Sequence, residues 1–225
     1  MTKSISLVVN ARLNSTRLPR KMLKPFANST LIEITLKKIN KITLFDDVIF
    51  AVYDQELIDI ADKYKNVKIL KRDEDEVQKG IVDLKTRFKY FNKIETDYIF
   101  LLNPCCPLTS TKTIINAYNY FQNTDYNTYT SVIKSRDWIF DSNSNSITRK
   151  DSSNVATNKG DWFYKATHMF HILNKKFFVD NGIIWTFGEN DPRCIEVPKD
   201  EYYDVDDDDD FHITQYAYIR SFKDD

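Results

Sequence analysis

The chain has 225 residues, of which 42% are hydrophobic and 14% aromatic, so it can bury a substantial core. Its 32 Lys and Arg residues and 33 Asp and Glu residues give a formal net charge of −1. This balance excludes the generally basic surface that binds nucleic acid, and no apolar run is long enough for a transmembrane helix. The three Cys residues, two of them adjacent, make a poor disulfide framework. We therefore expect a cytoplasmic protein, with no signal peptide and with no nucleic-acid or membrane partner.

The first half of the chain alternates between apolar runs and stretches with helical spacing. The apolar runs predict buried parallel strands at residues 5–9, 48–52, 67–70 and 98–102. The helical spacing predicts helices at residues 31–40, 55–64, 76–91 and around 114–121. This pattern predicts an α/β fold with a doubly wound, mostly parallel sheet. With the strand order 3-2-1-4, the loops that begin at Ala11 and Asn103 line the crevice at the switch point.

The second half of the chain loses this alternation. Strands are predicted at residues 129–134, 183–187 and 194–197 and within 162–173, and a closing helix at 211–222. Residues 141–157 are rich in Ser and Asn, which predicts a loop, a hairpin or an arm for a partner subunit. No repeat or long linker divides the chain. We therefore expect one domain over residues 1–225, with a small β-rich extension at about 129–175.

A strongly basic loop follows the first predicted strand. It contains five cations and three small polar side chains without an acid among them: Arg12, Arg17, Arg20, Lys21, Lys24, Asn14, Ser15 and Thr16. A loop at the carboxyl end of a strand is where open α/β sheets bind ligands, and a phosphate-rich ligand needs cations and backbone N–H groups. The alternative is a basic loop that is only solvated.

The spacing within this loop resembles a family signature. The pattern Ala-Arg-x-x-Ser-x-x-x-Pro-x-Lys-x-(Leu or Ile) is met by Ala11, Arg12, Ser15, Pro19, Lys21 and Leu23. It is similar to the loop of the cytidylyltransferases that activate acidic sugars, the CMP-sialic acid and CMP-Kdo synthetases. The resemblance implies a Rossmann-like nucleotidyltransferase whose loop wraps the triphosphate of CTP, with Arg12 and Lys21 on the phosphates. The chain departs from the family at Leu13 and Asn14, where glycines are frequent, although Asn tolerates a left-handed backbone.

The loop after the fourth strand, Asn103 to Leu108, resembles the family segment Leu-Gln-Pro-Thr-Ser-Pro-Leu-Arg. Asn103 matches the side chain that reaches the substrate pocket, for both nucleotide and acceptor, while Thr109 replaces the Arg. Cys105 and Cys106 stand where Thr and Ser are common. A metal or redox pair is one interpretation, but adjacent cysteines suit metal geometry poorly, so small packing residues are the simpler one.

The acidic run near the end of the chain has two interpretations. Five consecutive acids are usually a solvated surface. However, Asp204 and Asp206 alternate with Val205, and in an extended segment such residues point to one side and can hold a hard divalent cation. Together with Asp210 they resemble the family motif Ile-Asp-Ile-Asp-x-x-x-Asp. The resemblance implies that Asp204 and Asp206 bind Mg²⁺.

Five further residues are candidates because of where they lie in the sequence. Asp54 follows the second strand and either contacts the nucleotide or caps the next helix. Arg72 follows the third strand, where relatives place a basic residue near the nucleotide. Lys165 and His168 match the family's acceptor segment, in which His168 stands for a Gly. His168 and His171 either hydrogen-bond the acceptor or sit satisfied in a strand.

The resemblance implies an enzyme that transfers CMP from CTP to an acidic sugar, sialic-acid-like or Kdo-like, and releases pyrophosphate for surface glycan biosynthesis. It also implies Mg²⁺ as cofactor and a homodimer whose arm lies near the partner's active site. One alternative is a nucleotidyltransferase of this fold that acts on a phosphorylated or other non-sialic acceptor. Another is a non-catalytic nucleotide-binding module.

Overall fold

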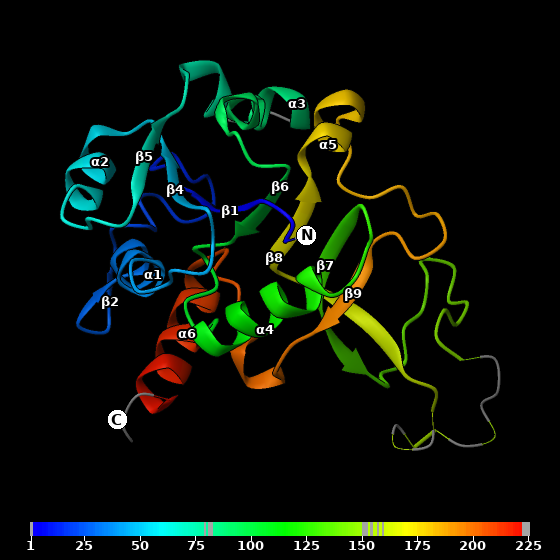
Figure 1. The fold of residues 1–225 in the computed structure, drawn as a ribbon. Helices are drawn as coiled ribbons and strands as arrows, with labels where there is room; N and C mark the ends of the chain where they lie inside the picture. Colours follow the sequence, from blue (N-terminus) through cyan, green and yellow to red (C-terminus); the bar gives the residue numbers. More distant parts are fainter. Residues whose placement is uncertain are drawn as a thin grey trace.

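The computed structural model describes residues 2–78, 80, 83–149, 153, 155–156, 158 and 160–221. Within them, a seven-stranded sheet runs through the molecule in the order β5-β4-β1-β6-β8-β7-β9 (Figure 1). Its strands are β1 (Ile5–Asn10), β4 (Asp47–Val52), β5 (Lys68–Lys71), β6 (Tyr98–Leu102), β7 (Thr128–Ser135), β8 (Phe163–Asn174) and β9 (Arg193–Glu196). A small hairpin pairs β2 (Pro25–Phe26) with β3 (Ser29–Thr30).

The predicted fold class and strand order are confirmed. β5, β4, β1 and β6 are parallel neighbours, which is the order 3-2-1-4. The predicted extension continues the same sheet, because β8 pairs antiparallel with β6 and with β7, and β9 pairs parallel with β7. The switch point lies between β1 and β6, and the loops after these two strands meet there.

Each face of the sheet carries its own core. Along β1, Ile5, Leu7 and Val9 pack into one core and Val8 into the other, as expected from the two-residue repeat of a strand. The first core packs against α1 (Leu31–Ile39), α2 (Gln55–Ala61), α4 (Thr111–Gln122) and α6 (Asp208–Ser221), and the second against α3 (Leu84–Arg87) and α5 (Lys175–Asn181). Figure 1 shows α3 and α5 on the side of the sheet opposite α1, α4 and α6. Burial on both faces explains why these strands read as continuous apolar runs.

The predicted helix at residues 76–91 is wrong for the part of it that the structure describes. A 3₁₀ turn, η1 (Glu74–Glu76), is followed by the short α3 and by a second 3₁₀ turn, η2 (Lys89–Lys93). Gly80 has φ 77°, and Asp83 starts α3 by accepting a hydrogen bond from the Thr86 backbone N–H. A left-handed residue and a new N-cap both end a helix, so the apolar repeat instead packs short turns against the second core.

Three further differences concern the second half of the chain. The predicted strand at 183–187 is a loop, in which Phe187 has φ 56°. The short helix α5 was not predicted, although Asn174 caps it and Gly182 ends it at φ 71°. α6 begins at Asp208, inside the acidic run. Acidic side chains in a first turn stabilise a helix, because they lie at the positive end of its dipole. Among the described residues, no helix is long and apolar enough to cross a membrane.

Candidate functional site

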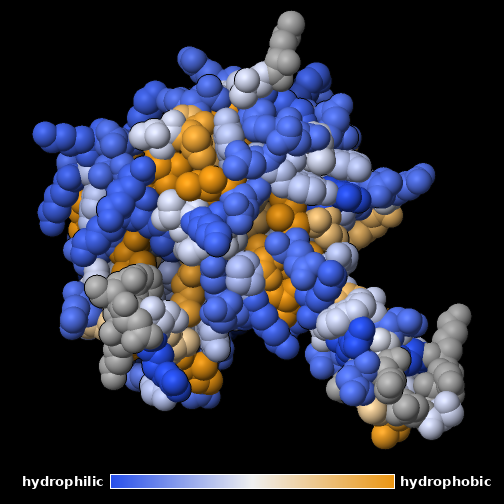
Figure 2. Space-filling view, turned by 60° about the horizontal axis from the view of Figure 1, so that its bottom comes forward, coloured by the Kyte–Doolittle hydropathy of each residue, from blue (hydrophilic) through white to orange (hydrophobic). Residues whose placement is uncertain are grey.

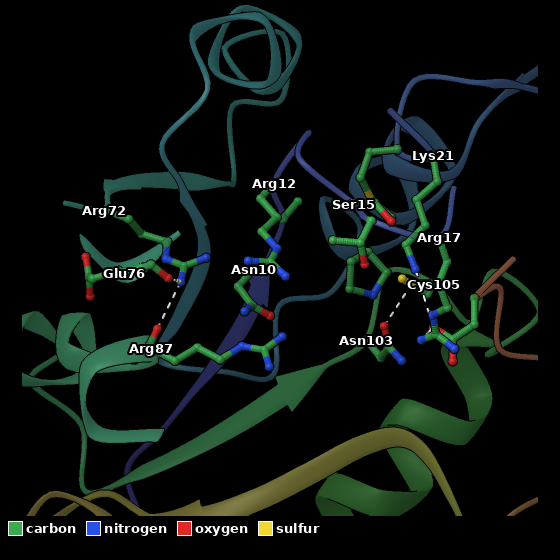
Figure 3. Close-up of a pocket in the computed structure, with 15 residues that line it drawn as sticks. Asn10, Arg12, Ser15, Arg17, Lys21, Arg72, Glu76, Arg87, Asn103 and Cys105 are labelled. Atoms are coloured by element: carbon green, nitrogen blue, oxygen red, sulfur yellow. Dashed lines mark hydrogen bonds and ion pairs between the residues drawn. The ribbon is translucent and has the colours of Figure 1, made fainter. Parts of the chain in front are cut away.

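A cavity of about 220 Å³ lies at the carboxyl ends of β1 and β6. Five cations line it, from three separate segments: Arg12, Arg17 and Lys21 of the basic loop, Arg72 after β5, and Arg87 of α3. Its two lining carboxylates are Glu76 and Asp206. Figure 3 shows Arg72 and Glu76 at one end, Arg12 in the middle, and Lys21 and Arg17 at the other end. This excess of positive charge suits a polyphosphate.

The cavity brings together most residues that the sequence pointed to. Its lining includes the predicted nucleotide residues Ala11, Arg12, Ser15, Lys21, Arg72 and Asn103, and the predicted metal ligand Asp206. Three charged lining residues were not assigned to the site from sequence: Arg17, Glu76 and Arg87. Arg17 belongs to the basic loop, so its charge and place were a usable signal. Glu76 and Arg87 fell within the predicted helix at 76–91, and only the folded chain brings them to the cavity.

Two predicted nucleotide residues shape the loop without lining the cavity. Asp54 stands at the N-cap position of α2, but its side chain makes no capping bond there and instead accepts a hydrogen bond from the Leu13 N–H at 3.0 Å. Asn14 donates its Nδ2 to the Val77 carbonyl at 2.8 Å. Both residues therefore fix the course of the basic loop between β1 and α1.

Arg12 points into the cavity but is bound to backbone. Its Nη1 donates to the carbonyls of Val77, at 3.1 Å, and Gln78, at 2.9 Å. Burial, and then the charge of Arg87, lower the pKa of Arg12, so two cations lie close together in a partly dry place. An anion between them would relieve this repulsion, and phosphate is a stronger acceptor for a guanidinium than a neutral carbonyl.

Arg72 builds the wall of the cavity. Its Nη2 donates to the carbonyls of Glu76, at 2.6 Å, and Arg87, at 2.9 Å, which ties η1 to α3. The guanidinium lies 5.0 Å from the ring centre of Tyr90, and burial lowers the pKa of Arg72. Its Nε has no hydrogen-bond partner among the described residues. Arg72 therefore holds Arg87 in place and keeps one donor unused beside the cavity.

Lys21 and Arg17 join the basic loop to the acidic segment. Lys21 Nζ donates to the Val205 carbonyl at 2.7 Å and lies 3.7 Å from Asp206 Oδ1. Arg17 Nη2 lies 2.6 Å from the same carboxylate oxygen. The basic loop near the N-terminus and the acidic segment near the C-terminus thus meet at Asp206.

Asp204 and Asp206 form the paired carboxylates that the sequence predicted. Asn103 Nδ2 lies 3.4 Å from both oxygens of Asp204. Burial, and then the neighbouring charge of Asp206, raise the pKa of Asp204. Asp210 has a structural role, because its Oδ2 accepts the backbone N–H groups of Asp206 and Asp207 at the start of α6.

These carboxylates fit a Mg²⁺ ion. No group of three or more His, Cys, Asp or Glu residues that could hold a metal occurs among the described residues. Mg²⁺ commonly uses only one or two carboxylates and takes its other ligands from water and substrate phosphates. Burial, and after it the charge of Asp206, raise the pKa of Asp204, and a cation between the two carboxylates would offset both effects.

A second cavity, of about 380 Å³, adjoins the first at Asp206. It lies between β8 and α6, and its polar lining includes Thr167, His168, Tyr202, Asp204 and Asp210. The predicted acceptor residue His168 lines it. Lys165, the other one, is not part of the lining, but its Nζ lies 5.0 Å from the ring centre of Tyr202.

The adjacent cysteines have the properties of packing residues. Cys106 is buried in the first core, and Cys105 packs against it. Burial raises the pKa of Cys105 to about 11 and that of Cys106 well above its usual value. Both thiols are therefore protonated at neutral pH, whereas a metal ligand or a redox thiol must ionise.

A cation-lined cavity at the switch point of a mostly parallel sheet, beside two carboxylates, is suited to binding a nucleotide, as in the nucleotidyltransferase class. Residues 6–186 match the family model described as cytidylyltransferase, and the chain belongs to this family. The predicted family is thereby confirmed.

The curated relatives share parts of their length with this chain. It is 38% identical over 71 residues to the 3-deoxy-manno-octulosonate cytidylyltransferase of Francisella tularensis subsp. novicida (strain U112), covering 32% of this chain and 28% of that protein. It is 27% identical over 133 residues to the enzyme of that name from Rickettsia typhi (strain ATCC VR-144 / Wilmington), covering 59% of this chain and 54% of that protein. The matched segments thus span between about a quarter and half of these relatives.

Solved structures share the fold over nearly the whole chain. The CMP:2-keto-3-deoxy-manno-octonic acid synthetase complexed with CTP has a TM-score of 0.70 at 12% identity, covering 98% of this chain and 100% of that one. The 4-diphosphocytidyl-2C-methyl-D-erythritol synthase of Anaerococcus prevotii DSM 20548 has a TM-score of 0.68 at 15% identity, covering 97% of this chain and 96% of that one. At such identities the likeness is one of fold.

Proposed function

We propose that the protein transfers CMP from CTP to an acidic sugar, sialic-acid-like or Kdo-like, and releases pyrophosphate, as a step in surface glycan biosynthesis. The observation that carries this proposal is the meeting of two cavities at Asp206, one lined by five cations and one by carboxylates. The curated relatives described above are named 3-deoxy-manno-octulosonate cytidylyltransferases, which supports a sugar acid as the acceptor.

The basic cavity holds the triphosphate. Lys21, Arg12 and Arg17 bind the β- and γ-phosphates and stabilise the negative charge that grows on the departing pyrophosphate. Ala11 and Ser15 bring backbone close to the phosphates, and Asn103 joins this cavity to Asp204. Arg87 supports the nucleotide at the far end, beside Arg72. Such a transfer depends on position and charge, because the protein forms no covalent bond to the substrate.

Asp204 and Asp206 would hold Mg²⁺. When bound, the ion neutralises charge on the α-phosphate and lowers the pKa of the attacking hydroxyl. Asn103 orients the Asp204 carboxylate, and Arg17 and Lys21 orient that of Asp206.

The second cavity receives the acceptor. Within the described residues, no Arg or Lys lines it, whereas three Asp residues do. A phosphorylated acceptor would bring two negative charges to this surface, so we favour a sugar with a single carboxylate. Lys165 lies beside Tyr202 at the edge of the cavity and provides the cation for that carboxylate.

The test is pyrophosphate release from Mg-CTP with a panel of acceptors: 3-deoxy-manno-octulosonate, a nine-carbon sialic-type acid and a phosphorylated polyol. We expect release with one of the two sugar acids and none with the phosphorylated polyol. Release with the phosphorylated polyol alone would favour the nucleotidyltransferase with another acceptor. CTP binding without release on any acceptor would favour a non-catalytic module.

We also propose that the protein is a homodimer through an extension at about residues 129–175 of a single domain. The described residues between 136 and 162, here called the arm, project from the body as the lobe at the lower right of Figure 2. Within the arm, the Arg136 guanidinium lies 3.8 Å from the ring centre of Trp162, and Trp138 Nε1 donates to the Val155 carbonyl at 3.1 Å. Phe140, Ile147 and Val155 are exposed, and a second copy would cover them.

A further inference from the structure

The edge of the acceptor cavity is formed by an unusually large bulge in β8. Between the pairs Thr130–His171 and Val132–Ala166, Ser131 alone on β7 faces residues 167–170 of β8. The bulge is pinned from within, because buried Thr167 donates to Ser131 Oγ at 2.7 Å and the Phe170 N–H donates to the same oxygen at 3.2 Å. Bulges beside active sites commonly re-aim a side chain. Here the re-aimed side chain is that of His168.

His168 occupies a backbone conformation that histidine rarely adopts. Its φ is 54°, in the left-handed region that favours glycine. Strain of this kind persists only where the surrounding structure imposes it, and it gathers at functional sites. A glycine would fit this place without strain, so the imidazole itself is the feature to be explained.

The imidazole is held on two sides. The ring stacks on Trp185, with ring centres 6.1 Å apart and an interplanar angle of 19°. His168 Nδ1 lies 3.3 Å from His171 Nε2, and His171 Nδ1 lies 3.1 Å from Thr130 Oγ1. The loop at 183–187, predicted as a strand, thus serves to place Trp185 against His168.

This hydrogen-bonded row carries no charge at its inner end. Burial, and then the neighbouring His168, lower the pKa of His171 to about 3, so its ring is neutral in the folded protein. A neutral imidazole donates through one nitrogen and accepts through the other. We assign the tautomer in which His171 Nδ1–H donates to Thr130 Oγ1, so that His171 Nε2 accepts from His168 Nδ1–H. This tautomer leaves the lone pair of His168 on Nε2.

His168 Nε2 is the basic atom that remains in the acceptor cavity. It makes no hydrogen bond among the described residues, and the side chain is exposed to the cavity that it lines. Asp204 and Asp206 are the proposed ligands of Mg²⁺, and Asp210 already accepts two backbone N–H groups.

We propose that His168 Nε2 takes the proton of the acceptor hydroxyl as that oxygen attacks the α-phosphorus of CTP. The inference rests on the proposed function. The bond from the acceptor oxygen to the α-phosphorus forms, and the bond from the α-phosphorus to the bridging oxygen breaks. Pyrophosphate leaves with that electron pair, and the proton passes from His168 to solvent. His171 is a positioning residue that fixes the ring and its tautomer.

The test is chemical rescue of His168→Gly, with CTP and the best acceptor of the panel. Glycine relieves the backbone strain, so thermal unfolding should match or exceed that of the wild type. We expect kcat to fall by about 10²-fold or more, the scale of losing one general base, with the KM for CTP unchanged. Added imidazole should restore part of kcat in this variant. It should do nothing for His212→Asn, the control on exposed α6, whose kcat should equal that of the wild type.

His171→Asn provides a second arm of the experiment. It leaves His168 in place but removes its hydrogen-bond partner, so we expect kcat to fall roughly tenfold, as for other orienting partners, without imidazole rescue. Wild-type kcat in His168→Gly, a loss that imidazole does not restore, or a raised KM for the acceptor at unchanged kcat would each overturn the role of His168. Absence of pyrophosphate release by the wild type would instead overturn the proposed function.

Discussion

Lys21 lies where the basic loop meets the acidic segment near the end of the chain. Its side chain is only 13% exposed, and its Nζ contacts the Val205 carbonyl and the Asp206 carboxylate. One carbonyl, one shared carboxylate and the Cys105 thiol are a modest set of partners for a mostly buried ammonium. Phosphate oxygens in the adjoining cavity would complete it, which makes Lys21 the lysine best placed for the leaving pyrophosphate.

We predict that Lys21→Ala lowers kcat by about 10²-fold or more, because one stabiliser of the leaving group is lost. Lys24→Ala is the matched control in the same loop. Lys24 pairs with Asp208 at 2.5 Å and is not part of the cavity lining, so its loss should leave kcat near the wild-type value. Stopped assays of pyrophosphate release decide between the two, and wild-type turnover in Lys21→Ala would remove this residue from the site.

The paired carboxylates allow an equally direct test. We predict that Asp204→Asn and Asp206→Asn abolish Mg²⁺-dependent pyrophosphate release even at saturating CTP, because the ion keeps too few anionic ligands. Asp209→Asn changes the same charge in the same acidic run. Asp209 is exposed and has no hydrogen bond or ion pair in the described part of the chain, so its variant should retain activity. Equal activity of all three variants would show that the run is only a solvated acidic surface.

At the level of single residues, the sequence predicts the site residues that lie in a motif and misses those that reach the cavity only through folding. Arg12, Lys21 and Asp206 lie in segments with a spacing signal, and the structure brings them to one cavity. Arg87 carries no such signal. It reaches the cavity because Arg72, from the end of β5, binds its carbonyl.

At the level of elements, one lysine ties α1 to the loop after β6. Lys38 Nζ donates to the Pro107 carbonyl at 3.0 Å and also to the Thr109 carbonyl. This loop carries Asn103, which orients Asp204. Burial lowers the pKa of Lys38 from 10.5 to about 8, and the charge of Glu201 offsets only part of this effect.

This lowered pKa predicts a pH dependence of stability. Below pH 8 Lys38 is protonated in both the folded and the unfolded chain, so it contributes no pH dependence. Between pH 8 and 10.5 the unfolded chain binds more protons, so the free energy of unfolding rises with pH, by up to about 1.4 kcal/mol per pH unit. Urea unfolding at pH 7.5 and 9.5 should show that the free energy of unfolding rises more with pH for the wild type than for Lys38→Met. Lys37→Met, on the exposed side of α1, should parallel the wild type, and a parallel Lys38→Met would contradict the prediction.

The elements that sequence failed to predict were decided by local caps. The apolar repeat over residues 76–91 is typical of a helix, yet the N-cap at Asp83 and the left-handed Gly80 divide it. Asp73 and Glu76 close a reciprocal capping box on η1, and Glu76 also accepts the buried Tyr90 N–H at 2.6 Å. Hydrophobic periodicity reports only which side chains share a face, so it cannot detect such competing hydrogen bonds.

At the scale of the whole molecule, the parallel half of the sheet was predictable and the antiparallel half was not. Strands β1, β4, β5 and β6 are parallel neighbours joined by crossover connections, whose handedness is nearly always the same, and this limits the orders that the sheet can adopt. The place of β8 beside β6 depends on contacts between distant residues, including the buried Ser131 that pins its bulge. These contacts build the acceptor cavity, which explains why sequence described the nucleotide half better than the acceptor half.

The arm gives the last prediction. Its apolar side chains Phe140, Ile147 and Val155 are 55%, 66% and 73% exposed, which is a large apolar area for a segment that projects into solvent. If a second copy covers them, light scattering of the wild type at micromolar concentration should give the mass of a dimer. The double variant Phe140→Lys and Ile147→Lys should shift this mass toward that of a monomer, because burying two ammonium groups in an interface is costly.

Leu44→Lys is the control for that experiment. Leu44 is 43% exposed in the segment between α1 and β4, outside the arm, so adding a charge there should leave the dimer intact. A wild-type monomer would refute the dimer, and a dimer that both variants retain would move the interface away from the arm. Activity adds a second readout. If the arm reaches the partner's acceptor cavity, kcat should fall when the protein is diluted below the dissociation constant of the dimer. If the arm only joins the two copies, kcat should not depend on protein concentration.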